Sequence, residues 1–287
     1  MKNLVKLMTD FTYQNGLEVS RVFDDLLRYI IQGYTLPGYP GLKDWHYTKE
    51  QNVVFHEMYA QIVLIMQREI KHKLWFDVFG NIYEELIASK SRRSNSGQFF
   101  TPESLCDLMT EICQGEEKQT GKLISDCACG SGRTLLAHHV RNLGNYYVAE
   151  DIDKTCAMMC VCNFLLHGVM GEVIWHNSLI PEQFYGAWKI NQDLNNPFSK
   201  FCGIPHIQPM EWGDTIIKKM LDGMSKVTRI QKHLQESAEK HLARFKSLRR
   251  QKVLTNEEKQ EAKAELMKYN NIKRALRKGS YTFPNLN

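Results

Sequence analysis

Hydrophobic residues in the first 90 positions of the chain recur at the spacing of α-helices. Apolar positions three or four residues apart place side chains on one helical face, as at Val22, Leu26, Leu27, Ile30, Ile62, Ile65 and Met66. A connector rich in proline, glycine and aromatic residues (33–45) interrupts this pattern and is typical of a loop. The pattern therefore predicts a helical N-terminal domain over residues 1–90.

Between residues 91 and 210, short apolar runs alternate with helical stretches. Strands are predicted at 122–127, 146–151 and 173–176, and helices near 133–143 and 154–167. Such alternation predicts βαβ units, a parallel sheet and an α/β fold. Ligands bind at the carboxyl ends of the strands in such sheets. Polar residues follow or close the predicted strands at Asp126, Asp151 and Asn177.

The first predicted strand ends in a glycine-rich turn, Asp126-Cys127-Ala128-Cys129-Gly130-Ser131-Gly132. A strand, a tight turn and a helix in this order let backbone N–H groups approach a ligand closely. Small-residue turns of this kind also occur simply as packing devices, so the turn alone leaves both interpretations open.

The last part of the chain, residues 211–287, is predicted to be a basic helical tail. Apolar spacing continues over 212–252, and Thr255 with Glu258 forms a capping-box pattern that opens a second helix to about residue 278. The two helices are expected to form an antiparallel hairpin. Residues 218–278 carry a net charge of +11, against −6 for the rest of the chain. This segregation favours a nucleic-acid partner; a solvated basic face and a coiled-coil contact with another subunit are the alternatives.

The overall composition is that of an ordinary globular protein, with 43% hydrophobic and 24% charged residues. No apolar run approaches the length of a membrane span, and the apolar core of a signal peptide does not follow the N-terminus. We therefore expect a cytoplasmic protein without membrane contact.

Eight cysteines raise the question of a metal site or disulfides. None of them forms a CxxC pair, and Cys156, Cys160 and Cys162 fall within an apolar helical pattern. Free cysteine behaves as a small buried hydrophobe, so reduced core thiols are expected and no metal is predicted. Zinc is the alternative, although paired ligand spacing is missing.

Three segments in sequence order carry a family resemblance: Gly97–Pro102 (GQFFTP), Asp126–Gly132 and Ala149–Asp153 (AEDID). Together they resemble the amino-methylating DNA methyltransferases that place their cofactor-binding motif first. The modification subunit of type I restriction systems, which methylates adenine N6, is the most similar type. The resemblance covers roughly residues 75–200. It implies a Rossmann-like sheet that binds S-adenosylmethionine, a helical N-terminal domain that helps close over DNA, and a separate specificity subunit, because no module for reading DNA sequence is visible.

The resemblance also implies roles for individual residues in cofactor binding. The segment with Gln98, Phe99, Phe100 and Thr101 would pack over the methionine end, and the loop residues Asp126, Ala128, Gly130 and Gly132 would curl around the cofactor. Asp151, followed by Ile152, would accept the ribose hydroxyls, and Asn177 with Ser178 would lie beside the adenine. The alternatives are Glu150 in place of Asp151, helix capping by Asp151, a helix cap or turn at Asn177, and core packing for the two phenylalanines. For Gln98 and Thr101 the alternative is that they only stabilise the turn. Cys127 replaces the proline that is usual in this loop.

The candidate catalytic motif is Asn195-Asn196-Pro197-Phe198, one substitution away from the NPPF of the family. The resemblance implies that Asn195 accepts a hydrogen bond from adenine N6 and that Phe198 stacks on a flipped base. Asn196, before Pro197, replaces the first proline of the family, which fixes the backbone so that its carbonyl points at N6. The preceding residues 189–194 are polar, which suits a sheet edge or a loop rather than a central strand. An ordinary turn is therefore the alternative. A truncated sheet is a second open alternative to the complete sheet of the family, because the chain after residue 205 has a helical pattern.

The sequence thus predicts an adenine-specific DNA N6-methyltransferase, or a subunit of one, that uses S-adenosylmethionine. The alternative is a catalytically degenerate relative that binds the cofactor, nucleic acid or both as an assembly factor. Methylation of RNA or of protein glutamine by the same class of motif also stays open.

Overall fold

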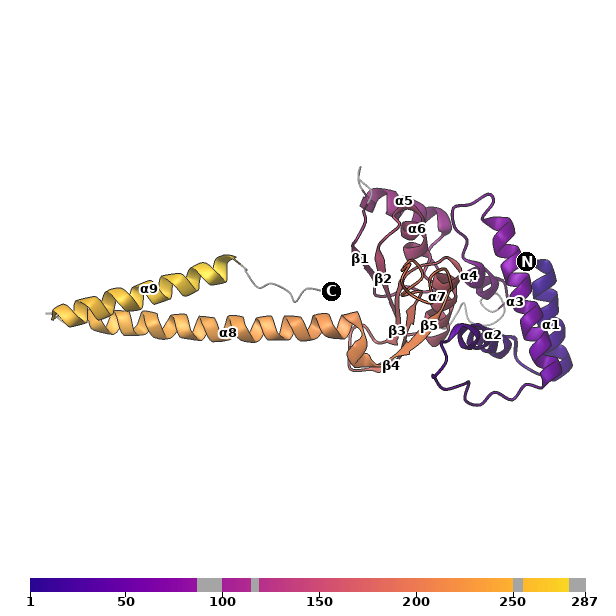
Figure 1. Ribbon diagram of the computed structural model, residues 1–287, viewed down its shortest axis with the longest axis horizontal. Helices are drawn as coiled ribbons and strands as arrows, with labels where there is room; N and C mark the ends of the chain where they lie inside the picture. Colours follow the sequence, from indigo (N-terminus) through magenta and orange to yellow (C-terminus); the bar gives the residue numbers. More distant parts are fainter. Residues whose placement is uncertain (87–99, 115–118, 250–254, 279–287) are drawn as a thin grey trace. The chain divides into compact units, whose positions relative to one another are not determined.

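The computed structural model describes residues 1–86, 100–114, 119–249 and 255–278. The chain divides into two compact units, Met1–Thr215 and Ile216–Asn287 (Figure 1). Each unit is considered by itself below. None of the described helices combines the length and the apolar character needed to cross a membrane.

The N-terminal part is helical, as its apolar spacing predicts. Its helices are α1 (Lys2–Asn15), α2 (Val19–Tyr34), α3 (Lys49–Glu69) and α4 (Val78–Tyr83). The Pro/Gly-rich connector separates α2 from α3, and Thr48 with Gln51 begins α3 through a reciprocal capping box. Helices α2 and α4 pack against a helix of the sheet region, so one hydrophobic core joins residues on both sides of the predicted boundary at residue 90.

A mixed sheet of five strands forms the centre of the first unit, and the α/β class is as predicted. The strands are β1 (Leu123–Asp126), β2 (Tyr146–Asp151), β3 (Gly171–His176), β4 (Phe184–Ile190) and β5 (Ile207–Met210), in the spatial order β1-β2-β3-β4-β5. The pairs β1–β2 and β2–β3 are parallel, as the βαβ pattern predicts. Strands β4 and β5, which the sequence pattern did not indicate, pair antiparallel with their neighbours. The chain reverses direction in the loop 177–183 after β3 and again in the segment 191–206 after β4.

Three helices accompany the sheet: α5 (Glu103–Gln114), α6 (Arg133–Arg141) and α7 (Lys154–Leu166). Helix α7 packs on β2, β3 and β4, while α6 packs on β1 and on α5. The helix α7 is apolar on nearly all sides and is buried from Cys156 to Leu165, including the three cysteines predicted as core thiols. All eight cysteines are free, and the described residues contain no group of side chains suited to hold a metal ion.

The second unit contains the helical hairpin predicted from its sequence. After a short 3₁₀ helix at Trp212–Asp214, α8 (Ile216–Arg249) and α9 (Asn256–Lys278) pack on each other. Thr255 and Glu258 make both bonds of the predicted capping box. Ion pairs from His241 to Glu265 and from Arg244 to Glu261 cross the hairpin in antiparallel register.

Candidate functional site

The carboxyl ends of β1, β2 and β3 meet at one edge of the sheet, and hydrogen bonds tie their loops together. The Gly130 N–H donates to Oδ2 of Asp151 across 2.8 Å, joining the loop after β1 to the end of β2. The Ser178 hydroxyl donates to the carbonyl of Cys127 across 2.9 Å, joining the loop after β3 to the same place. The structure therefore brings together the predicted residues of the three strands.

The glycines of the loop are required by its conformation. Gly130 and Gly132 have φ angles of 55° and 91°, in the left-handed region that L-residues with side chains rarely adopt. A Cβ atom at Gly132 would lie 2.9 Å from Sγ of Cys160 on α7, and one at Gly130 would lie 3.0 Å from the ring of Phe100. The loop therefore fits closely between α7 and the segment that precedes α5.

A cavity of about 260 Å³ opens beside the loop. Asp126 at the end of β1 accepts the N–H of Ala128 at 3.1 Å and the hydroxyl of Thr134, so its carboxylate holds the turn that borders the cavity. The wall is formed by the loop, the start of α6 and the residues around α5, namely Phe100, Thr101, Met109, Asp126, Ala128, Cys129, Gly130, Ser131, Arg133 and Thr134.

Asp151 is a partly buried carboxylate whose two oxygens both accept backbone N–H groups. Besides the bond from Gly130, Oδ1 accepts the N–H of Asp153 at 2.8 Å. Burial raises the pKa of Asp151 above its ordinary value, and these two backbone bonds act in the opposite direction. The helix-capping role falls to Asp153, which accepts the N–H of Cys156. Ile152 between them is 60% exposed at the surface of the site.

Glu150, the alternative to Asp151, is directed elsewhere. Its Oε2 lies 2.6 Å from Nε2 of His176, and both side chains are buried. Consecutive residues of a strand point to opposite faces of the sheet, so Glu150 and Asp151 cannot serve the same site. The geometry favours Asp151 as the acidic residue at the loop.

The remaining predicted cofactor residues have structural partners of their own. The Phe100 ring lies 5.6 Å from that of Tyr83 and 5.2 Å from the Arg133 guanidinium, so packing and a cation–π contact already engage it. Asn177 accepts the Leu179 N–H at 3.1 Å. This bond forms a turn, which is the alternative role of Asn177. The Thr101 carbonyl accepts a bond from Arg133. Gln98 and Phe99 lie outside the described residues.

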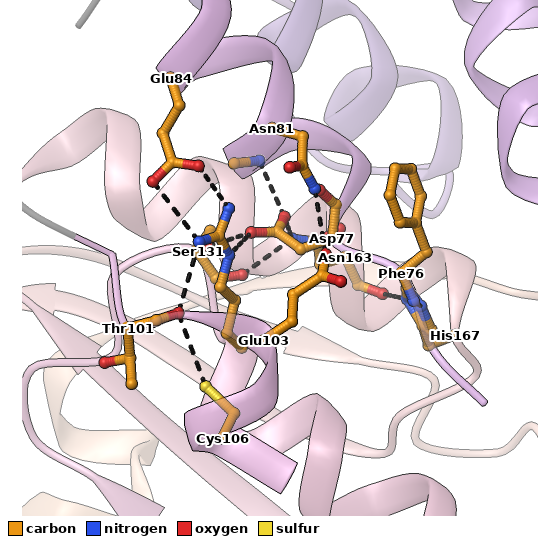
Figure 2. A network of polar contacts seen from close by, with 12 residues as sticks. Phe76, Asp77, Asn81, Glu84, Thr101, Glu103, Cys106, Ser131, Asn163 and His167 are labelled. Atoms are coloured by element: carbon orange, nitrogen blue, oxygen red, sulfur yellow. Dashed lines mark hydrogen bonds and ion pairs between the residues drawn. The ribbon is translucent and has the colours of Figure 1, made fainter. Parts of the chain in front are cut away.

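Beneath the loop lies a buried polar network that the sequence reading did not identify (Figure 2). Asp77, which precedes α4 and has no solvent exposure, accepts four hydrogen bonds. The donors are the Gly80 N–H at 2.8 Å, the Ser131 hydroxyl at 2.6 Å, Nε of Arg133 at 2.6 Å and Nδ2 of Asn163 at 2.7 Å. The only sequence signal was local: an Asp three residues before a glycine at the start of a short helix is an N-cap pattern.

Arg133 links this carboxylate to two further segments. Its Nη2 donates to Glu84 at 2.9 Å and its Nη1 to the Thr101 carbonyl at 3.4 Å. Burial alone would lower the pKa of the Arg133 guanidinium, but Asp77 and Glu84 outweigh that effect and raise it. The network therefore attaches the glycine loop to α4, to α7 and to the residues before α5, and holds it in one position.

The structure does not bring Asn195, Pro197 and Phe198 to this loop. Because β4 runs antiparallel to β3, its last residue, Ile190, pairs with Gly171 at the start of β3. The segment that follows therefore leaves the sheet at the end opposite to the carboxyl ends of β1–β3. The N–H of Phe198 donates to the Asn196 side chain in a turn, and the Phe198 ring is 96% exposed. The polarity of residues 189–194 predicted a sheet edge or a loop. A loop begins at residue 191, whereas Lys189 and Ile190 belong to β4, which pairs with β3 on one side and β5 on the other.

Comparison with known proteins assigns a family to the region that contains the loop and its network. A family model described as N-6 DNA methylase matches residues 75–211. These residues are similar to the N-6 DNA methylase family. The chain is also 29% identical over 140 residues to the type I restriction enzyme EcoEI methylase subunit of Escherichia coli. That alignment covers 42% of this chain and 27% of the relative, so the chain matches about a quarter of the relative's length. No solved structure matches the chain.

The N-6 DNA methylase match begins at Trp75, two residues before Asp77. Helix α4, which the sequence pattern assigned to the N-terminal domain, is thus part of the matched region and supplies the buried acid that holds the glycine loop. The match ends at residue 211, just after β5 and before the helical hairpin.

Proposed function

We propose that S-adenosylmethionine binds at the Asp126–Gly132 loop. The observation that carries this proposal is the convergence of the glycine loop, Asp151 and Asn177 at one sheet edge within the N-6 DNA methylase match. A carboxylate at the end of β2 can accept ribose hydroxyls with the lone pairs that its two backbone bonds leave free. Asp126 at the cavity is suited to the amino group of the methionine moiety. When bound, the cofactor would supply an activated methyl group.

For this chain, the reaction that we propose is methylation of adenine N6 in DNA, carried out as a subunit of a larger assembly. The family match supports a DNA methyltransferase, and the matched relative is itself named as the methylase subunit of a type I restriction enzyme. The basic α8–α9 hairpin is proposed to contact DNA or a specificity subunit. On the hairpin, Arg244 and Lys268 are two of the basic side chains exposed to solvent.

The catalytic assignment of Asn195, Pro197 and Phe198 stays a prediction, and their placement favours a second candidate function. Because the segment lies at the other end of the sheet, the described fold presents no acceptor from it to a base at the loop. A cofactor-binding or nucleic-acid-binding assembly factor without methyl transfer is therefore the alternative.

Transfer of a labelled methyl group from S-adenosylmethionine to DNA, assayed for the full chain alone and with co-purified subunits, separates the two functions. The enzyme function predicts transfer that is lost in Asp151→Ala. Cofactor binding without transfer under both conditions would establish the alternative. Transfer that is lost in Asn195→Ala while cofactor affinity is unchanged would show that the predicted catalytic motif acts in the assembled enzyme.

A further inference from the structure

Helix α5 carries an apolar stripe that faces solvent. Its side chains recur at the i, i+3, i+4, i+7 spacing of one helical face, and they are Leu105 (43% exposed), Leu108 (50%), Met109 (44%) and Ile112 (72%). The opposite face is firmly attached: Cys106 and Thr110 are buried, and Asp107 bonds both Trp75 and Arg141. The helix is therefore held with its apolar stripe outward.

The strand β1, on which α6 packs, presents an unpaired edge. It stands first in the strand order, and among the described residues only β2 pairs with it. In a parallel pair alternate residues bond the neighbouring strand, and the Lys122 carbonyl accepts the Tyr146 N–H at 2.9 Å. Leu123 and Ser125 therefore direct their N–H and C=O groups outward. Such an edge is a template for another strand, and Leu123 is 37% exposed.

The stripe, the edge and the glycine loop are linked through α6 and through a shared cavity. Helix α5 packs on α6, and α6 packs on β1; Figure 1 shows α5 and α6 at the side of the sheet where β1 lies. Met109 of the stripe lines the same cavity as Asp126 at the end of β1. A segment lying along the outer edge of β1 and against the stripe would therefore end beside the loop.

We propose that a second polypeptide docks on this surface by adding a β-strand to the outer edge of β1. The free main-chain groups of Leu123 and Ser125 select a strand over a helix, since only an extended backbone pairs with both. The stripe selects apolar side chains on the face of that strand toward α5. Nucleic acid does not fit, because α5 carries no basic residue that could pair with its phosphates.

The proposal of a docking surface depends only on this geometry. The role of that surface in catalysis rests, in addition, on the proposed function. If the cofactor binds at the loop, the end of the added strand is the position from which a partner can supply the acceptor for adenine N6. This arrangement would complete in trans the site that Asn195 and Phe198 do not reach.

Site-specific photo-cross-linking in cells that naturally carry this gene tests the surface. Benzoylphenylalanine is placed in the full chain at Ile112 or at Leu123, with Val53 on α3, which is 66% exposed, as the matched control. We expect both test positions to cross-link one and the same polypeptide, at neighbouring positions of a single segment. Cross-links no stronger than those at Val53, or cross-links only to a second copy of this chain, would overturn the proposal.

Two substitutions separate strand addition from other kinds of contact. Ser125→Pro removes an outward N–H without breaking a bond to β2, and Ile112→Glu puts a charge on the stripe. Each should abolish the cross-link from Leu123 while leaving the thermal midpoint of the chain unchanged, because neither group has a partner within the described fold. A cross-link that survives both variants would refute strand addition. Titration of the wild-type chain with S-adenosylmethionine tests the proposed function separately, because the docking surface does not require the cofactor.

Discussion

Replacing Asp77 by asparagine should destabilise the first unit far more than the loss of a surface ion pair would. The carboxylate has no solvent exposure and accepts hydrogen bonds from Gly80, Ser131, Arg133 and Asn163 at 2.6–2.8 Å. An amide in its place presents an NH₂ group to donors and removes the charge that faces a guanidinium with 6% exposure. Arg133 would keep Glu84 as its acidic partner, and the Glu84 side chain is 44% exposed.

The expected loss follows from the energetics of buried ion pairs. Removing one partner of a buried pair costs about 3–5 kcal/mol, because the other charge is left without compensation. Since Glu84 compensates part of the charge, we expect a loss of about 3 kcal/mol in the free energy of unfolding. For a unit of this size that corresponds to a fall of roughly 6–12 °C in the thermal midpoint.

Tryptophan fluorescence during urea unfolding measures this loss selectively, because all five tryptophans lie within residues 1–215. Glu103→Gln is the matched control: Glu103 pairs with the partly exposed Lys73 in the same region, and such pairs contribute about 1 kcal/mol or less. The double variant Asp77→Asn/Arg133→Met should be less destabilised than the sum of the two single variants. A loss for Asp77→Asn no larger than for Glu103→Gln would refute the role given to the network.

Three further predictions concern the loop, a buried histidine and the acid at the end of β2. Gly132→Ala should abolish cofactor binding and destabilise the unit more than Gly38→Ala, which shares a positive φ (99° against 91°) but has nothing near its Cβ; equal losses in urea unfolding would exclude the clash with Cys160. Burial lowers the pKa of His139 from 6.5 to about 4, so stability should be complete above pH 6.5 and fall as the pH drops toward 4, by about 3 kcal/mol in total; unfolding curves of His139→Phe should lack most of this dependence. Because burial raises the pKa of Asp151 and the ribose hydroxyls need the carboxylate, calorimetry should show cofactor affinity falling on acidification at a higher pH than an ordinary aspartate would cause, whereas Asp151→Asn should bind weakly at every pH.

Local sequence patterns were enough to predict much of the fold. Alternating apolar runs and helical spacing predicted β2 and α7 within a residue or so of their bounds, because one buried face imposes a period on the sequence. The bonds between Thr255 and Glu258 were also predictable, because the capping box is complete within four residues.

The features that the sequence did not reveal depend on contacts between distant segments. The direction of β4 depends on whether the chain turns back after Asn177 or crosses over the sheet, and its apolar pattern is compatible with both. That choice decides where Asn195 and Phe198 lie. Asp77 was missed because its partners lie 54 and 56 positions away at Ser131 and Arg133. A single sequence does not show that such residues meet.

Isothermal titration of the full chain with S-adenosylmethionine tests the central claim most directly. We predict saturable binding at one site per chain, with affinity at least about tenfold weaker in Asp151→Ala, the equivalent of about 1.4 kcal/mol. Val53→Ala is the control, because its exposed side chain lies on α3 and does not line the cavity beside the loop. Absence of binding in the wild-type chain, or equal affinity in wild type and Asp151→Ala, would contradict the assignment of the Asp126–Gly132 loop as the cofactor site.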